Sequence, residues 1–118
     1  MTSIRRIVSN IEASDMQQSE QFYSQVLGMV KAMDLGWIKT FAAPDDPTKQ
    51  ISILAADPSS IHPNLSIEVA DVDAVHQAAV AQGQPIVYPL TDEPWGVRRF
   101  FLRDPSGLII NIVSHRAS

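Results

Sequence analysis

Apolar and polar residues alternate over several stretches of this chain, and this pattern predicts a protein built mainly from β-strands. One face of residues 4–13 holds Ile7, Ser9, Ile11 and Ala13, and one face of residues 64–70 holds Leu65, Ile67 and Val69, while the other face of each stretch is largely polar. A period of two is typical of a strand with one buried face. Further strands are predicted where β-branched and aromatic residues gather. They cover residues 29–35, 37–42, 50–56, 86–90, 97–103 and 108–113.

The alternation stops twice, and both interruptions predict a helix. Ser14 or Asp15 can cap the first helix, and Gly28 ends it. Asp71 or Asp73 can cap the second helix, which Gly83 ends. Helical spacing gives each segment one apolar stripe that we expect to be buried. The stripes are Ser19, Phe22, Tyr23, Val26 and Leu27 in the first helix, and Val72, Val75, Ala79 and Val80 in the second.

The last two predicted strands are joined by the sequence Asp-Pro-Ser-Gly at 104–107. Proline presets φ at the second turn position, the aspartate side chain can bond its own backbone, and glycine tolerates positive φ. We therefore predict a β-hairpin here. A further turn is expected over residues 44–47, and the break near Gly36 separates the second predicted strand from the third.

The same order of elements, strand, helix and three strands, occurs twice, which indicates an internal duplication. The stretch 57–63 between the copies has two prolines and two serines and is predicted to be a linker. The predicted fold is α+β, a single domain 1–118 with one βαβββ module over about 4–56 and another over about 64–115. A single ferredoxin-like α+β sheet is the alternative, but it would use fewer strands.

Composition narrows the classes of function. The 118 residues carry a net charge of −4, and 45% of them are hydrophobic, as in ordinary globular proteins. No cysteine is present, so disulfides, thiolate metal sites and thiol catalysis are excluded. Basic residues are scattered, which argues against a nucleic-acid partner. No apolar run approaches the length of a membrane span and the N-terminus has no signal-like segment, so we expect a cytoplasmic protein.

Motifs in both halves resemble the vicinal oxygen chelate superfamily, which includes glyoxalase I, fosfomycin-modifying enzymes, extradiol dioxygenases and the bleomycin-resistance proteins. The first half has Asp15, then Phe22-Tyr23, then Leu27-Gly28. The second half has IEVADVDAV, PWG at 94–96 and DPSG at 104–107. The resemblance covers the whole chain. It implies two βαβββ modules that form a curved mixed sheet around a cleft, usually in a dimer whose subunits can share each cleft.

In the enzymes of this superfamily a divalent metal is held in the cleft by His or Glu on the first strand of a module and by Glu on its last strand. Carried over to this chain, these positions fall on Val8, Asn64 and Asn111. Valine has no donor atom, and an asparagine amide is a poor ligand for a catalytic transition metal. We therefore expect no metal and no cofactor, and the chain is nearest to the metal-free, bleomycin-resistance-like members.

The predicted function is a metal-free homodimer that binds and sequesters a small, partly aromatic molecule. Strand alternation indicates which side chains face the cleft, and a tryptophan in a loop and one at a strand start add to them. We take these residues as ligand-binding candidates. The competing interpretation is that they bond to other groups of the protein. The candidates are Val8, Asn10, Glu12, Trp37, Asn64, Ser66, Glu68, Trp95, Arg99, Phe101 and Asn111. No catalytic residue is assigned.

Two other functions stay open. One is a metal-dependent glyoxalase-like lyase or dioxygenase with a displaced site built from His62, His115, Glu12 or Glu68. The other is a regulatory or structural dimer without a ligand. His76, in the second predicted helix, is expected on the surface.

Overall fold

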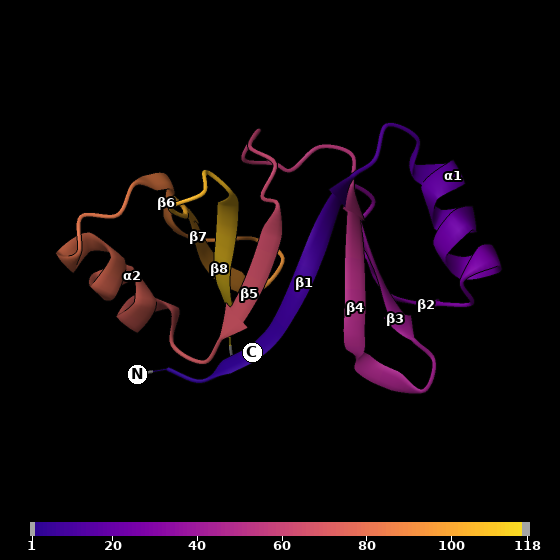
Figure 1. Cartoon of the computed structure of the whole chain (residues 1–118), viewed down its shortest axis with the longest axis horizontal. Coiled ribbons are helices and arrows are strands. Elements are labelled where there is room, and N and C mark those ends of the chain that lie inside the picture. Colours follow the sequence, from indigo (N-terminus) through magenta and orange to yellow (C-terminus); the bar gives the residue numbers. More distant parts are fainter. Residues whose placement is uncertain (1, 117–118) are drawn as a thin grey trace. The chain divides into compact units, whose positions relative to one another are not determined.

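The computed structural model describes residues 2–116 and contains the repeated order of elements (Figure 1). The α+β class and the two successive βαβββ patterns are confirmed. The strands are β1 (Ile4–Glu12), β2 (Val30–Asp34), β3 (Ile38–Ala43), β4 (Asp46–Leu54), β5 (Leu65–Val69), β6 (Ile86–Asp92), β7 (Val97–Arg103) and β8 (Ile109–His115). The helices are α1 (Met16–Gln21), the π-helix η1 (Phe22–Val26) and α2 (Val72–Ala81).

The chain divides into two compact units. The first unit is Val8–His62, and the second unit joins Met1–Ile7 to Pro63–Ser118. Strand β1 therefore contributes to both units, because its residues Ile4–Ile7 belong to the second. The boundary between His62 and Pro63 lies at the end of the predicted linker, in a stretch without a strand or helix.

Both units share one strand order. The first runs β2-β3-β4-β1 and the second runs β6-β7-β8-β5. In each, the first strand of the pattern pairs in parallel with the last, β1 with β4 and β5 with β8, and the other pairs are antiparallel. Strand β6 lies at an edge, which suits Pro89 because proline cannot donate to a ladder.

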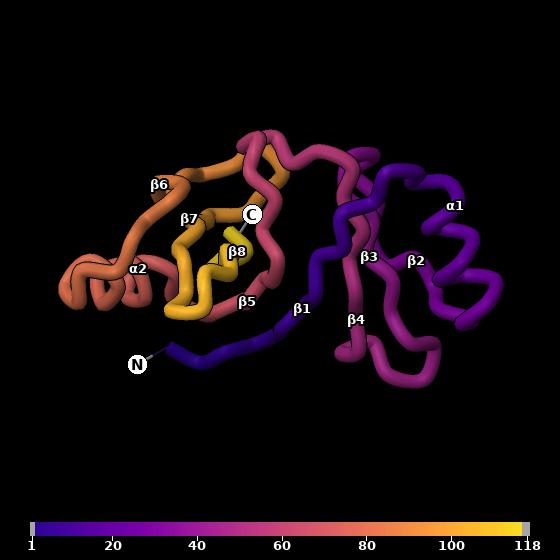
Figure 2. Tube along the Cα trace, turned by 45° about the horizontal axis from the view of Figure 1, so that its top comes forward, coloured from indigo at the N-terminus to yellow at the C-terminus, as the bar shows by residue number. Residues whose placement is uncertain are grey.

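Helix α2 covers one face of the sheet of the second unit (Figure 2). Its buried Val72 and Ala79 pack on Phe100, Ile110 and Ile112. Asp71 caps this helix, since its carboxylate accepts a hydrogen bond from the backbone N–H of Ala74 at 3.1 Å. The expected stripe is wrong at one position, because the side chain of Val80 is 57% exposed.

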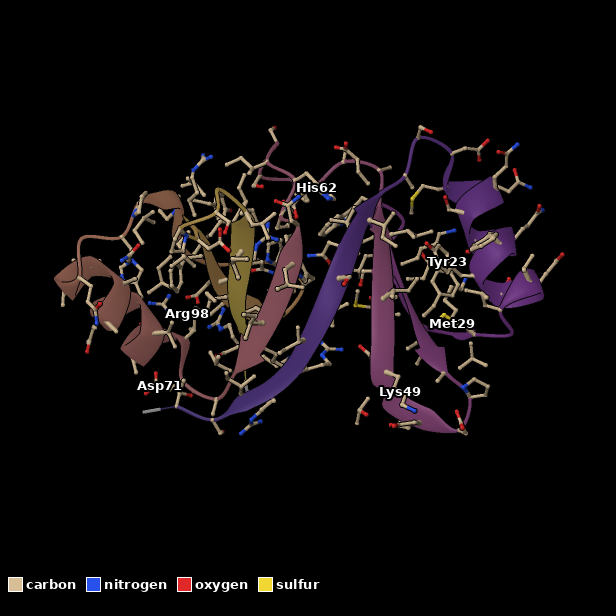
Figure 3. All side chains as sticks on the ribbon, in the orientation of Figure 1. Tyr23, Met29, Lys49, His62, Asp71 and Arg98 are labelled. Carbon is tan, nitrogen blue, oxygen red and sulfur yellow. The ribbon has the colours of Figure 1, made fainter. Side chains whose placement is uncertain are left out.

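The first helix differs from the prediction. Asp15 caps it as expected, but α1 gives way at Phe22 to the π-helix, in which Leu27 N–H bonds Phe22 O. A π-helix adds a residue per turn and so moves the later side chains out of the predicted stripe. Phe22, Val26 and Leu27 are exposed, while Tyr23 and Met29 lie between the sheet and α1 and pack on the core (Figure 3).

The DPSG turn forms as predicted. The carboxylate of Asp104 accepts hydrogen bonds from Ser106 N–H at 2.9 Å and Leu108 N–H at 2.8 Å, and Gly107 has φ +90°. Strand β4 begins earlier than expected, at Asp46, because the turn shrinks to residues 44–45. Within residues 2–116, no helix has both the length and the apolar composition needed to cross a bilayer.

Candidate functional site

A group of mainly polar and aromatic side chains lies on one face of the second unit's sheet, the face opposite α2. We call it the polar face. Strand register places these side chains in two rows. Ser66, Asn111, Phe101 and Tyr88 are successive partners across β5, β8, β7 and β6. Glu68, Val113, Arg99 and Thr91 form the neighbouring row. Alternation along each strand turns these residues away from the apolar core beneath α2.

Asn111 lies at the centre of the first row and is buried, with 8% of its surface exposed. Its amide nitrogen donates to Ser66 Oγ at 3.0 Å. Its Oδ1 atom is buried and has no hydrogen-bond partner. An unsatisfied buried acceptor is unfavourable by about 1–3 kcal/mol, so such atoms are rare outside functional positions. The Oδ1 atom of Asn111 is therefore a buried acceptor on the polar face that lacks a hydrogen-bond partner.

Asn64 has a different role, because its Oδ1 accepts the backbone N–H of Ile109 at 3.0 Å. The residue precedes β5 and is exposed. This bond extends the pairing of β5 with β8. It gives Asn64 a structural role. Asn64 stays a ligand-binding prediction, but its carbonyl oxygen already has a partner.

Arg99 is the centre of a buried ionic and aromatic cluster in the second row. Its Nε donates to Glu93 Oε2 at 2.6 Å, and the two side chains are 4% and 8% exposed. The guanidinium carbon lies 4.9 Å from the ring centroid of Trp95, 4.8 Å from that of Phe101 and 5.3 Å from that of Tyr88. Cation–π attraction at such distances is strongest when water is excluded.

The hydroxyl of Tyr88 also donates to Glu93 Oε2, at 2.9 Å. Two donors on one carboxylate compensate for the burial of Glu93. Trp95 is thus packed against Arg99 of its own unit, a contact within the protein that competes with a role in ligand binding. Its indole contributes a fixed wall beside Phe101.

Glu68 bonds at both carboxylate oxygens. Arg6 approaches Oε1 at 2.9 Å and His115 Nδ1 approaches Oε2 at 3.3 Å. These contacts are structural bonding of the kind that competes with a ligand-binding role for this acid. His115 is more than half exposed, so its share of the pairing is weakened by solvent.

Four predicted residues lie in the first unit. Val8 and Asn10 are buried, Glu12 is exposed and Trp37 is half-buried. The backbone carbonyl of Asn10 is bonded to His62 Nε2 at 3.1 Å. This bond gives His62 a local structural partner.

The two units repeat the same register. Asn10 pairs with Ser52, which pairs with Thr40, just as Ser66 pairs with Asn111 and then Phe101. Ser52 and Thr40 are buried and share a hydrogen bond of 2.7 Å. Ser52 is thus the counterpart of Asn111, and the sequence analysis missed it. Aligning the two predicted modules strand by strand would have found it.

Tyr88 and Glu93 were also missed. Glu93 follows the predicted sixth strand and precedes Pro94 and Trp95, in a loop for which alternation gives no signal. Tyr88 falls inside that strand, but β6 has two irregular pairings, between Ile86 and Tyr88 and between Tyr88 and Thr91. Bulges of this kind shift the inward and outward sides of a strand.

The metal positions implied by the family resemblance do not fit a transition metal. Val8 offers only hydrocarbon, Asn64 Oδ1 accepts a backbone bond, and Asn111 presents a single neutral oxygen. Ser52 is bonded to Thr40. Within residues 2–116, no three His, Cys, Asp or Glu side chains lie close enough together to hold a metal ion. Three protein ligands are usual in such centres.

Solved structures share this fold at low sequence identity. A protein from Legionella pneumophila described as an NAD-dependent benzaldehyde dehydrogenase has a TM-score of 0.76 and 19% identity, covering 93% of this chain and 99% of that one. Methylmalonyl-CoA epimerase from Mycobacterium tuberculosis has a TM-score of 0.70 and 21% identity, with 98% and 88% covered.

A superfamily member from Vibrio splendidus 12B01 has a TM-score of 0.68 and 12% identity, with 95% and 99% covered. No match was found among curated proteins. The family model of the Glyoxalase/Bleomycin resistance protein/Dioxygenase superfamily matches residues 5–112. That match covers most of the chain and parts of all eight strands, and the chain belongs to this superfamily.

Proposed function

We propose that the protein is a metal-independent homodimer that binds and sequesters a small, partly aromatic molecule on the polar face. The observation that carries the proposal is the buried Oδ1 atom of Asn111, which has no hydrogen-bond partner. A ligand N–H or O–H group that reached this atom would satisfy it. Burial of an amide without such a partner is otherwise unfavourable.

The surroundings of Asn111 match a planar ligand. Phe101 is the row neighbour of Asn111 and packs at 5.0 Å, centroid to centroid, on Tyr88. Both rings are held in place by the Arg99–Glu93 pair. A ring that is already fixed loses little conformational entropy on binding, so an aromatic ligand gains more from stacking on it.

Binding without a metal follows from the donor chemistry at Val8, Asn64 and Asn111. Of the side chains at these three positions, only Asn111 keeps an oxygen without a partner. The proposal that the ligand is bound and not converted also rests on the lack of metal-binding side chains at these three positions. Metal analysis of protein purified without added metal tests this part, since one transition-metal ion per chain would contradict it.

Thermal-shift screening with planar aromatic compounds bearing N–H or O–H groups tests the binding. Bleomycin is included because the family is named after resistance to it. A ligand selective for the folded state must raise the apparent melting temperature. For a hit, Asn111→Leu should weaken binding by about three- to tenfold, the effect of one lost hydrogen bond.

The matched control is Ser114→Ala. Ser114 lies on the same strand, and its hydroxyl donates to Val69 O at 2.8 Å. This substitution also removes one hydrogen bond from β8 but leaves Asn111 intact, so binding should be unchanged. Equal affinities of wild type and Asn111→Leu would refute the role of Asn111. Activation by added Ni, Zn, Mn or Fe, lost on Glu68→Gln, would instead support the metal-dependent enzyme.

A further inference from the structure

The second unit contains an apolar cleft that is separate from the polar face and is open to solvent on one side, where Ala78 is exposed and Ile4 is 62% exposed. It lies on the α2 side of the sheet and has a volume of about 470 Å³. Its walls come from three elements, helix α2, strands β5 and β8, and the N-terminal segment. The main lining residues are Ile4, Ile67, Val69, Ala74, Ala78 and Ile112.

The cleft exists because α2 presents small side chains toward β5. Ala74 and Ala78 are one helical turn apart and so lie on one side of the helix. Two methyl groups cannot fill the space above Ile67 and Val69. On the neighbouring side of α2, Val72 and Ala79 pack against the large ring of Phe100, and the core closes there.

The N-terminal segment forms the remaining wall and is held in place. Ala70 N–H donates to Ser3 O at 3.0 Å, and Asp71 N–H donates to Thr2 Oγ1 at 2.8 Å. The second bond engages the hydroxyl of Thr2, which is also part of the lining. Every other lining side chain is apolar, and none carries a charge. The part of the occupant that lies inside the cleft must therefore be uncharged, because no group there could compensate a buried charge.

Volume sets the size of the occupant. An engineered apolar cavity of 150 Å³ stays dry and binds benzene. A cleft about three times as large suits a molecule of two or three fused rings, or an alkyl chain of similar bulk. Water would find no polar partners among these walls, so a hydrocarbon that displaces it gains free energy.

We propose that this cleft is a second ligand site, which takes a neutral apolar molecule the size of a bicyclic or tricyclic hydrocarbon. The site is independent of the proposed function of the polar face, from which the sheet separates it. Its specificity would be for shape and not for hydrogen bonding.

The test uses 6-propionyl-2-(dimethylamino)naphthalene with the full chain, because this neutral bicyclic dye fluoresces in apolar surroundings and has no N–H or O–H group to donate to Asn111. Wild type should increase its fluorescence in a saturable manner, and naphthalene should displace it. Ala78→Leu fills the cleft and should weaken dye binding about tenfold or more while raising the melting temperature. The matched control is Ala81→Leu, an exposed position on the same helix outside the lining, which should bind the dye as wild type does.

Asn111→Leu separates the two sites, because it should leave dye binding unchanged whether or not the polar face binds a ligand. The proposal is overturned if wild type gives no saturable signal, or if Ala78→Leu binds the dye as tightly as wild type. Dye binding lost in Asn111→Leu but kept in Ala78→Leu would place the dye on the polar face. A dimer that Ala78→Leu dissociates, in size-exclusion chromatography without dye, would mean that a second copy covers the groove.

Discussion

The buried pair of Arg99 and Glu93 provides the sharpest test of how the polar face is held together. Replacing Arg99 by methionine keeps much of the volume but leaves the Glu93 carboxylate, 8% exposed, with Tyr88 as its remaining donor in this cluster. Breaking a buried pair by removing one partner destabilises by about 3–5 kcal/mol. Three cation–π contacts are lost as well, each worth roughly 0.5–1 kcal/mol or more.

A loss of that size is a large share of the roughly 5–15 kcal/mol that stabilises a typical domain. For a chain of this length it corresponds to a fall in melting temperature on the order of 10–20 °C. Urea titration followed by tryptophan fluorescence is the assay of choice, since Trp95 stacks on the guanidinium and reports its loss.

The double variant Arg99→Met with Glu93→Gln completes a mutant cycle. Because Glu93→Gln removes the charge that Arg99→Met leaves unpaired, the double variant should be clearly more stable than the sum of the single effects predicts. An Arg99→Met loss below about 1 kcal/mol, or a coupling energy near zero, would refute the view that this pair organises the polar face.

Three further predictions follow from other contacts. Asp71→Ala removes the cap that accepts Ala74 N–H and should lower the free energy of unfolding by about 1 kcal/mol in urea titrations, whereas Asp71→Asn should lose less. Asn111→Leu removes an unsatisfied oxygen but also the hydrogen bond to Ser66, so chemical denaturation should show a loss of no more than about 1 kcal/mol, and a much larger loss would contradict its assignment as a binding residue. Hydrogen bonding from Arg98 lowers the pKa of Asp73, so stability gained above the ordinary carboxyl pKa should be lost below about pH 4, with a weaker acid dependence in Asp73→Asn.

Much of the fold could be predicted from local signals. The caps at Asp15 and Asp71 and the turn at Asp104 form as expected, because each depends on a side chain bonding the backbone a few residues away. Strand alternation placed Ser66 and Asn111 on one face correctly. Such features need no knowledge of distant residues.

The failures share a physical cause. Helical spacing could not reveal the π-helix, at whose end Val26 and Leu27 are exposed, since that geometry breaks the period itself. Glu93 was missed because its partner Arg99 lies on a different element, and only strand register brings them together. The alanines of α2 look like ordinary helix formers in sequence, and the cleft beside them appears only once the opposing residues are known.

Strand β1 has a consequence for how a duplicated protein can be taken apart. Its residues Ile4–Ile7 belong to the unit that otherwise begins at Pro63. A fragment starting at Pro63 would lack Arg6, the counter-ion of Glu68, and Ser3, whose carbonyl receives Ala70 N–H. Separate expression of the latter half should therefore give a poorly soluble polypeptide, and adding the first seven residues back as a peptide should rescue it.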